Sequence, residues 1–81
     1  MMNNEELKEF RLMLDLSCKE AADLTYLTRQ QILNIETGKS NKKSTMYLME
    51  LCYKKYLEDH KSEVKERINN RTNLYFRLVG P

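Results

Sequence analysis

Residues 17–38 of this 81-residue chain read SCKEAADLTYLTRQQILNIETG, and they contain the start and stop signals of two short helices. Ser17, followed three residues later by Glu20, forms the capping-box pattern that begins a helix. Thr28 is the N-cap expected for a second helix, and Gly38 is the glycine that commonly follows a helix C-terminus. The stretch therefore predicts two short helices, Cys18 to Leu24 and Arg29 to Thr37, joined by a connector at residues 25–27.

Apolar residues upstream of this stretch repeat at the spacing of a helix. Leu7, Phe10 and Leu14 recur three and four residues apart, so they share one helix face. Asn4 is the expected N-cap of this helix, which has acidic residues in its first turn and ends near Asp15.

The stretch from residue 44 to residue 69 contains neither Gly nor Pro. It predicts either one long helix or two helices with a tight bend at residues 57–59, and we favour two. Ser44 or Thr45 begins the helical stretch after a polar, basic loop at residues 39–43. The side chains expected to face the core from this region are Leu48, Leu51, Cys52 and Leu57.

Composition agrees with a single small helical domain. Two Gly and one Pro are few, and the many Leu, Lys, Glu and Arg residues favour helices over strands. The formal net charge of +2 is too mildly basic to indicate nucleic-acid binding by itself. The positions of the charges therefore matter more than their sum.

Several function classes are not expected from this sequence. Cys18 and Cys52 lack the paired spacing of metal ligands and His60 is the only histidine, so no metal or other cofactor is expected. The charged run 58–61 around His60 is typical of a solvated helix face, and no Ser or Cys nucleophile has a visible base partner, so we expect no enzyme. Residues 1–6 are polar and acidic, unlike a secretory signal, and no apolar run approaches the roughly 20 residues that span a bilayer. We therefore expect an intracellular protein with no membrane partner.

An ordered series of residues between Leu7 and Leu57 resembles the DNA-binding domain of Cro- and lambda-type phage repressors, the XRE family of helix-turn-helix proteins. The series covers well over half of the chain, whereas a capped helix pair alone is a weak signal. The resemblance implies an all-α fold, a compact four- to five-helix repressor-like bundle with a helix-turn-helix at residues 1–70, followed by a C-terminal tail at residues 71–81. The residues that carry the match are Leu7, Arg11, the run Leu14 to Ala22, Leu24, the run Leu27 to Ile32, Ile35, Glu36, Gly38 and Lys39.

The resemblance also assigns DNA contacts to the helix that Thr28 begins and to its neighbours. Glutamine and asparagine can pair with adenine through two hydrogen bonds, arginine can do so with guanine, and leucine can contact a thymine methyl group. Lysines and helix N-termini bind phosphates without reading sequence. The expected base contacts are Arg29, Gln30, Gln31, Leu33 and Asn34. The expected phosphate contacts are Ser17, Cys18 and Lys19 at the start of the first of the two helices, and Lys39 and Lys42 in the basic loop.

Arg11 and Glu36 match a structural ion pair of this family. Arg11 lies within the apolar stripe of the first helix, and a buried guanidinium needs a carboxylate partner. The pair would join the first helix to the end of the DNA-reading helix and so fix the angle of that helix.

Three residues depart from the family pattern. Cys18 stands where the family usually has Gln, and a thiol is a poor hydrogen-bond donor to phosphate. Tyr26 stands where the turn often has Gly. If this position has a positive φ, a Tyr here would destabilise the fold by about 1 kcal/mol relative to Gly. Leu33 stands where the family usually has a polar residue. Together they suggest a surface that has drifted from reading DNA.

The resemblance implies a small phage-type transcriptional regulator that binds double-stranded operator DNA as a homodimer, in the cytoplasm of a bacterial host cell. An alternative is an antirepressor, or modulator, that binds a cognate repressor protein and masks its DNA-binding surface, since the modest charge and the three departures fit such a role. A third possibility is the antitoxin of a toxin–antitoxin pair, which would use both surfaces. The candidate dimer surface is the region after Cys52, with Tyr53, Tyr56, Leu57, Val64, Ile68 and the tail.

The tail at residues 71–81 contains several apolar and aromatic residues, from Leu74 to Val79. It is consistent with a strand, with an arm that binds a partner or with a docked extension. Residues 73–76, NLYF, also resemble part of a common protease-tag site, so the tail is alternatively a remnant of an expression vector.

Overall fold

The structure is a computed structural model that describes residues 1–63, and the expectations for Val64, Ile68 and the tail lie outside these residues. The described part is built from helices alone, which confirms the prediction of a small all-α bundle. Within this part, no helix has both the length and the apolar character needed to cross a membrane. The four main helices are α1 (Asn4–Met13), α2 (Cys18–Thr25), α3 (Arg29–Glu36) and α4 (Lys43–Asp59).

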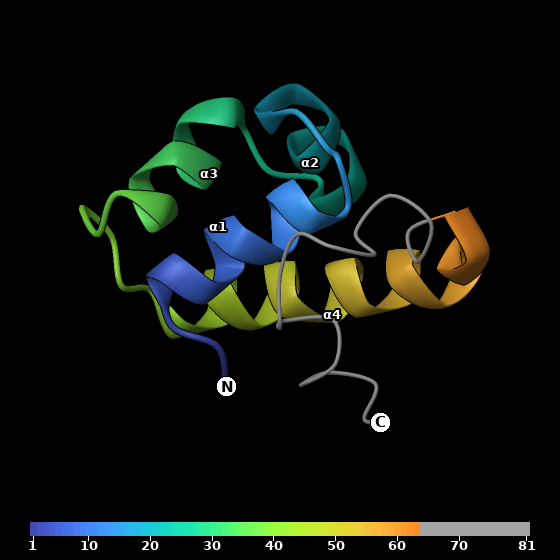
Figure 1. Cartoon of the computed structure of the whole chain (residues 1–81). Helices are drawn as coiled ribbons and strands as arrows, with labels where there is room; N and C mark the ends of the chain where they lie inside the picture. Colours follow the sequence, from blue (N-terminus) through green and yellow to red (C-terminus); the bar gives the residue numbers. More distant parts are fainter. Residues whose placement is uncertain (64–81) are drawn as a thin grey trace.

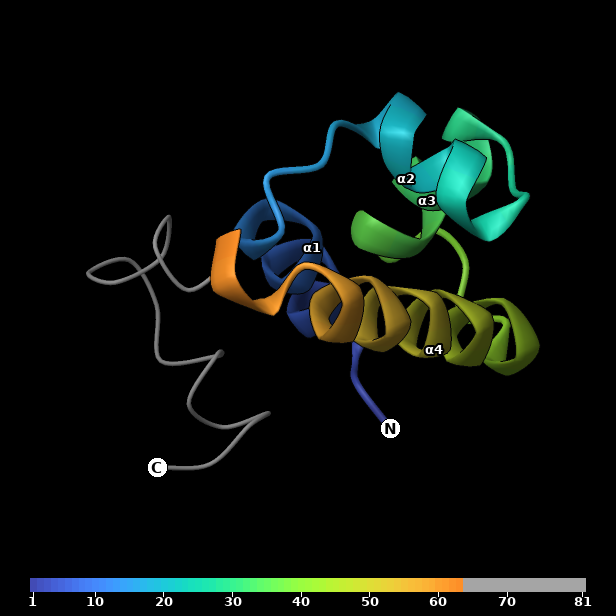
Figure 2. The ribbon, with the colours of Figure 1, turned by 90° about the vertical axis from the view of Figure 1, so that its right-hand side faces the viewer.

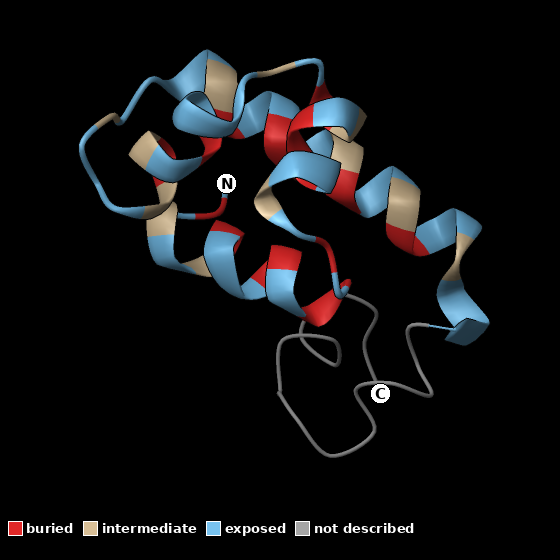
Figure 3. Cartoon of the chain, turned by 90° about the horizontal axis from the view of Figure 1, so that it is seen from above, coloured by how far each residue is buried: buried red, intermediate tan, exposed pale blue. Residues whose placement is uncertain are grey.

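The helices enclose one apolar core. α1 packs against α3 and α4, and α2 packs against the same two helices. In Figures 1 and 2, α4 runs along the bottom of the domain and α2 and α3 lie above it. Buried residues, drawn red in Figure 3, line the inward sides of the helices. The core residues are Met2, Leu7, Phe10, Met13, Leu14, Leu16, Ala21, Ala22, Ile32, Ile35, Met46, Met49, Tyr53 and Leu57.

Capping boxes begin α2 and α3, which confirms the predicted box at Ser17 and the predicted N-cap at Thr28. The Ser17 hydroxyl accepts a hydrogen bond from the backbone N–H of Glu20 at 3.0 Å, and the Glu20 carboxylate accepts one from the N–H of Ser17 at 2.9 Å. Thr28 and Gln31 make the same reciprocal pair, at 3.1 and 2.8 Å. These bonds satisfy backbone donors that have no partner within the helix, so each box fixes where its helix starts.

The N-cap of α1 is Asn3, and the prediction of Asn4 is wrong by one residue. Asn3 forms a capping box with Glu6, which lies three residues later and can reach back to the Asn3 N–H. Asn4 instead lies inside the helix, where its side chain points toward α3. α1 ends at Met13, and Asp15 adopts a left-handed conformation (φ 59°), so the predicted end near Asp15 is confirmed.

The prediction of which α4 side chains face the core is largely wrong. Leu48 and Leu51 are exposed and Cys52 is only partly buried, so of the four predicted residues only Leu57 belongs to the core. The buried stripe recurs at helical spacing but is formed mainly by methionines and a tyrosine. It consists of Met46, Met49, Glu50, Tyr53 and Leu57. Because Tyr53 and Leu57 are buried in the core, they are not available for the dimer surface that the sequence suggested.

The helical stretch breaks at His60, just beyond residues 57–59, where the bend was predicted. α4 ends at Asp59, His60 leaves the helical conformation (φ −124°, ψ 29°), and helical backbone resumes at residues 61–63. The imidazole of His60 stacks on the ring of Tyr56, with centroids 4.0 Å apart, and its Nδ1 lies 3.0 Å from the Tyr56 carbonyl oxygen. His60 is therefore half-buried against its own helix, rather than fully solvated as expected.

Tyr26 ends α2 in a left-handed conformation, with φ 59° and ψ 29°. Its N–H still bonds the carbonyl of Ala22, and the chain then turns into Leu27 and Thr28. The Tyr26 side chain is 95% exposed, so it gains no packing that would compensate for the strained backbone. The positive φ expected to penalise a residue other than Gly at this position is therefore present.

We expect Tyr26→Gly to raise the free energy of unfolding by about 0.5–1 kcal/mol, because Gly adopts this conformation without a Cβ clash. Tyr26→Ala is the matched control, since it removes the exposed ring and keeps the strained backbone. Urea denaturation of the three proteins measures both effects. A loss of stability in Tyr26→Gly would show that the ring makes a stabilising contact.

Tyr53 places a hydroxyl in the core between α1 and α4. Its ring meets Phe10 edge to face, with centroids 5.5 Å apart, and within residues 1–63 its hydroxyl has no hydrogen-bond partner. Burial raises the pKa of this phenol far above its usual value. Because Phe has the same shape without the unsatisfied oxygen, we expect Tyr53→Phe to be neutral or to stabilise the fold by up to about 1 kcal/mol in chemical denaturation. A clear destabilisation would mean that the hydroxyl is bonded in solution.

Candidate nucleic-acid interface

α3 has one side in the core and the other side in solvent. Ile32 and Ile35 are almost completely buried, and Leu27 packs against the core just before the helix. The predicted base-contact residues lie on the opposite side of the helix. Arg29, Gln30, Gln31 and Leu33 are exposed, Leu33 to 39%, and Asn34 is half-buried.

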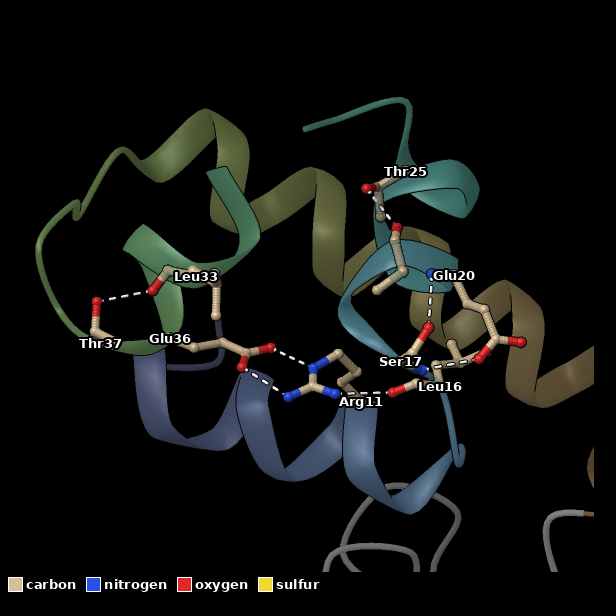
Figure 4. A network of polar contacts seen from close by, with 9 residues as sticks. Arg11, Leu16, Ser17, Glu20, Thr25, Leu33, Glu36 and Thr37 are labelled. Atoms are coloured by element: carbon tan, nitrogen blue, oxygen red, sulfur yellow. Dashed lines mark hydrogen bonds and ion pairs between the residues drawn. The ribbon is translucent and has the colours of Figure 1, made fainter. Parts of the chain in front are cut away.

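A buried ion pair ties the end of α3 to α1, which confirms the predicted pair. The Arg11 guanidinium donates from Nε to Glu36 Oε2 at 2.6 Å and from Nη2 to Oε1 at 2.9 Å (Figure 4). The two side chains are only 10% and 3% exposed. The hydrogen bond to Glu36 raises the pKa of Arg11, although burial opposes this effect. Such a bidentate contact fixes the relative orientation of the two side chains as well as the distance between them.

Arg11 makes a third contact, which the sequence did not predict. Its Nη1 donates to the carbonyl oxygen of Leu16 at 2.8 Å, just before the cap of α2 (Figure 4). One guanidinium therefore connects α1, the end of α3 and the segment that leads into α2. This contact has no signal in the sequence, because a backbone carbonyl is present at every position.

Asn4 provides a second link to α3 that the sequence missed. Its Nδ2 donates to the carbonyl of Ile35 at 2.7 Å and to that of Ser40 at 3.1 Å. The predicted helix stop is confirmed nearby, since Gly38 has φ 80° and its N–H bonds the Ile35 carbonyl at 3.1 Å. Contacts from both halves of α1 thus hold the last turn of α3, and the exposed side of α3 is fixed relative to the rest of the domain.

The amide side chains on α3 are not equivalent. Gln30 Nε2 donates to Asn34 Oδ1 at 2.8 Å, one helical turn away. The remaining N–H and the carbonyl oxygen of Gln30 stay available, and these are the donor and acceptor that pair with adenine. Gln31 uses its carbonyl oxygen in the cap with Thr28. Gln30 is therefore the amide best placed to read a base.

Basic residues lie next to this amide surface. Lys39 and Lys42 are exposed, and Lys42 lines a hollow of about 80 Å³ between α3 and the start of α4. Lys42 is also the N-cap of α4, so the prediction that Ser44 or Thr45 begins this helix is wrong by one or two residues. Lys42 makes no side-chain cap bond, so the first N–H groups of α4 are open to an anion. The residues that line the hollow are Gln31, Asn34, Ile35, Ser40, Lys42 and Thr45, which brings predicted base and phosphate contacts together.

The three predicted phosphate contacts at the start of α2 differ in their exposure to solvent. Ser17 and Lys19 are exposed, although the Ser17 hydroxyl is already used in its capping box. Cys18 is half-buried and packs against the core. Its thiol is therefore poorly placed for a phosphate, so the prediction of a phosphate contact at Cys18 is not supported.

Cys18 and Cys52 are both free thiols. Within residues 1–63, no group of His, Cys, Asp and Glu side chains is arranged to hold a metal ion. No protein-family model, no curated protein and no solved structure matches the chain.

Proposed function

We propose that this protein is a small transcriptional regulator that binds operator DNA through the exposed side of α3, in the cytoplasm of a bacterial host. The observation that carries the proposal is the amide edge of Gln30, which Asn34 holds in place on a helix that is itself fixed by the Arg11–Glu36 pair. Base reading requires hydrogen-bond donors and acceptors at defined positions. Here the bond to Asn34 positions the Gln30 side chain, and the Arg11–Glu36 pair positions the helix that carries it.

In the proposed complex, the N-terminal half of α3 enters the major groove. Gln30 pairs with adenine, Arg29 with guanine or phosphate, and Leu33 packs on a thymine methyl group. Lys39 and Lys42, together with the open N-terminus of α4, bind phosphates beside the groove. These contacts supply affinity and register, whereas Gln30 supplies the sequence preference.

Selection from a library of random DNA duplexes tests the proposal and does not require the operator sequence to be known. The expected result is an enriched sequence with a strongly preferred adenine at one position. Selection with Gln30→Ala is the matched control, and it should relax the preference at that position only. The absence of any enriched sequence with the unaltered protein would contradict sequence-specific binding.

A protein-binding modulator is the second candidate, and two observations favour it. Leu33 exposes apolar surface at the centre of the α3 face, and Tyr26 places an aromatic ring in solvent at the turn before α3. Tyrosine and other large apolar side chains are frequent anchors in protein interfaces. Addition of the protein to a co-encoded repressor on its operator separates the candidates. Release of the repressor that is abolished by Leu33→Lys would support the modulator.

A further inference from the structure

α4 exposes apolar side chains on the side that faces away from the core. Tyr47, Leu48 and Leu51 are 50%, 37% and 46% exposed. At about 3.6 residues per turn, they lie on the side of the helix opposite the buried stripe that begins at Met46. The outer side of α4 therefore has an apolar centre.

A lysine lies at each end of this apolar centre. Lys43, Tyr47, Leu51 and Lys55 are four residues apart, and side chains with this spacing form one continuous row on the surface of a helix. All four side chains are exposed. We call this row, together with Leu48 beside it, the α4 ridge. Its two positive ends lie about 18 Å apart along the helix axis.

The exposed charges around the apolar centre are all positive. Between residues 39 and 57 the only acidic residue is Glu50, which is buried and bonded to Lys54. Within the described part of the chain, no carboxylate forms a salt bridge with Lys43. Lys55 pairs with Asp59 at 3.0 Å, but both side chains are exposed. Such an exposed pair contributes little, so the Lys55 ammonium group is available to another carboxylate.

We propose that the α4 ridge binds an acidic amphipathic helix of a partner protein. The complementary row on that helix has a carboxylate, two apolar side chains and a second carboxylate, also four residues apart. The apolar side chains pack against Tyr47 and Leu51, and the carboxylates pair with Lys43 and Lys55. Tyr47 is the expected anchor, because tyrosine buries a large area and loses little conformational freedom on binding.

The charge pattern distinguishes this partner from a second copy of the chain. If two copies brought their apolar centres together, parallel or antiparallel, the lysines of one ridge would meet the lysines of the other. Like charges that face each other oppose association. An anionic membrane is a poorer match, because three apolar side chains bury little area and the exposed carboxylates of Glu58 and Asp59 follow in the next turn.

The α4 ridge is separate from the proposed DNA surface. α4 runs below α2 and α3 in both Figure 1 and Figure 2, and the α4 ridge faces away from the core that these helices cover. A partner on the α4 ridge would therefore leave Gln30 and its neighbours uncovered. The inference goes beyond the proposed function and does not depend on it.

A designed peptide tests the proposal without knowledge of the natural partner. The Glu peptide has about 18 residues, is rich in alanine so that it forms a helix, and carries Glu, Leu, Leu and Glu four residues apart. Titrated into the ¹⁵N-labelled full-length chain, it should shift NMR signals at the α4 ridge and leave the side-chain amides of Gln30 and Asn34 unchanged. The Lys peptide, with both Glu replaced by Lys, is the matched control and should not bind.

Charge reversal on the protein separates electrostatic selection from apolar contact. Lys43→Glu combined with Lys55→Glu should weaken binding of the Glu peptide at least about tenfold and should create binding of the Lys peptide. Leu51→Gln should also weaken binding of the Glu peptide, because it removes the apolar centre. Lys39→Glu and Leu33→Gln are matched changes away from the α4 ridge and should bind as the unaltered chain does. Circular dichroism shows whether each variant keeps its fold.

Several results would overturn the inference. If neither peptide bound, or if both bound with equal affinity, an acidic helix would not be the partner. Signals at the α4 ridge that shift on dilution of the protein alone would identify a second copy as the occupant. Broadening of these signals by phosphatidylglycerol vesicles, without binding of the Glu peptide, would identify a membrane surface instead. None of these tests involves DNA, so the inference and the proposed function can fail separately.

Discussion

Arg11→Ala is expected to lower the free energy of unfolding by about 3 kcal/mol, a large fraction of the stability of a domain of this size. The substitution removes two hydrogen bonds to Glu36 and one to the Leu16 carbonyl. It leaves the Glu36 carboxylate, which is only 3% exposed, without its cation. An uncompensated buried charge costs more than the loss of the contact itself. Urea denaturation followed by circular dichroism measures the change.

A double replacement separates charge from packing at the same site. Arg11→Met combined with Glu36→Leu removes both charges and keeps apolar volume, so it should be less destabilising than Arg11→Ala alone. Lys55→Ala is the surface control, because its pair with Asp59 is exposed and surface pairs contribute little. A loss near zero for Arg11→Ala would mean that the pair does not hold α3 in solution.

Gln30→Ala is expected to weaken binding to the preferred DNA sequence about 10- to 100-fold. This loss corresponds to the about 1–3 kcal/mol that one bidentate contact to a base contributes. Binding to unrelated duplexes should change little, because Gln30 carries no charge and phosphates supply the non-specific affinity. Fluorescence anisotropy with a matched and an unrelated duplex measures both values. An equal loss on the two duplexes would reject direct base reading by Gln30.

Two neighbouring substitutions are controls for Gln30. Asn34→Ala removes the group that holds the Gln30 amide, so it should reduce discrimination between duplexes but less than Gln30→Ala. Gln31→Ala removes the reciprocal cap bond to Thr28, so its main effect should be a small loss of fold stability. If Gln31→Ala reduced discrimination more than Gln30→Ala, the assignment of these two amides would have to be exchanged.

The features that the sequence predicted are those set by short-range rules. The box at Ser17 depends on two residues three positions apart and the N-cap at Thr28 on a single residue, so a local pattern is enough to place the starts of α2 and α3. Gly38 is a similar case, because few other residues tolerate its conformation. The Arg11–Glu36 pair spans 25 positions, and it was predicted from a family resemblance together with the need of a buried guanidinium for a carboxylate.

The features that the sequence missed depend on how the helices pack. α4 has large apolar residues on two sides, so its periodicity alone did not show that Met46, Met49 and Tyr53 face the core while Leu48 and Leu51 face solvent. The link from Asn4 to α3 joins distant segments through backbone carbonyls, which no side-chain pattern marks. The different roles of the three amides on α3 likewise follow from side-chain geometry.

The most direct test of the central proposal is a titration of the full chain with the DNA upstream of its own coding sequence, at two salt concentrations, followed by fluorescence anisotropy. A scrambled duplex of the same length and composition is the control. The proposal predicts tighter binding to the upstream duplex at both salt concentrations, with an affinity that falls as salt rises because phosphate contacts release counterions. Lys42→Ala should reduce the salt dependence on both duplexes by roughly one contact. Equal affinity for the two duplexes, or no binding to either, would contradict base reading by α3.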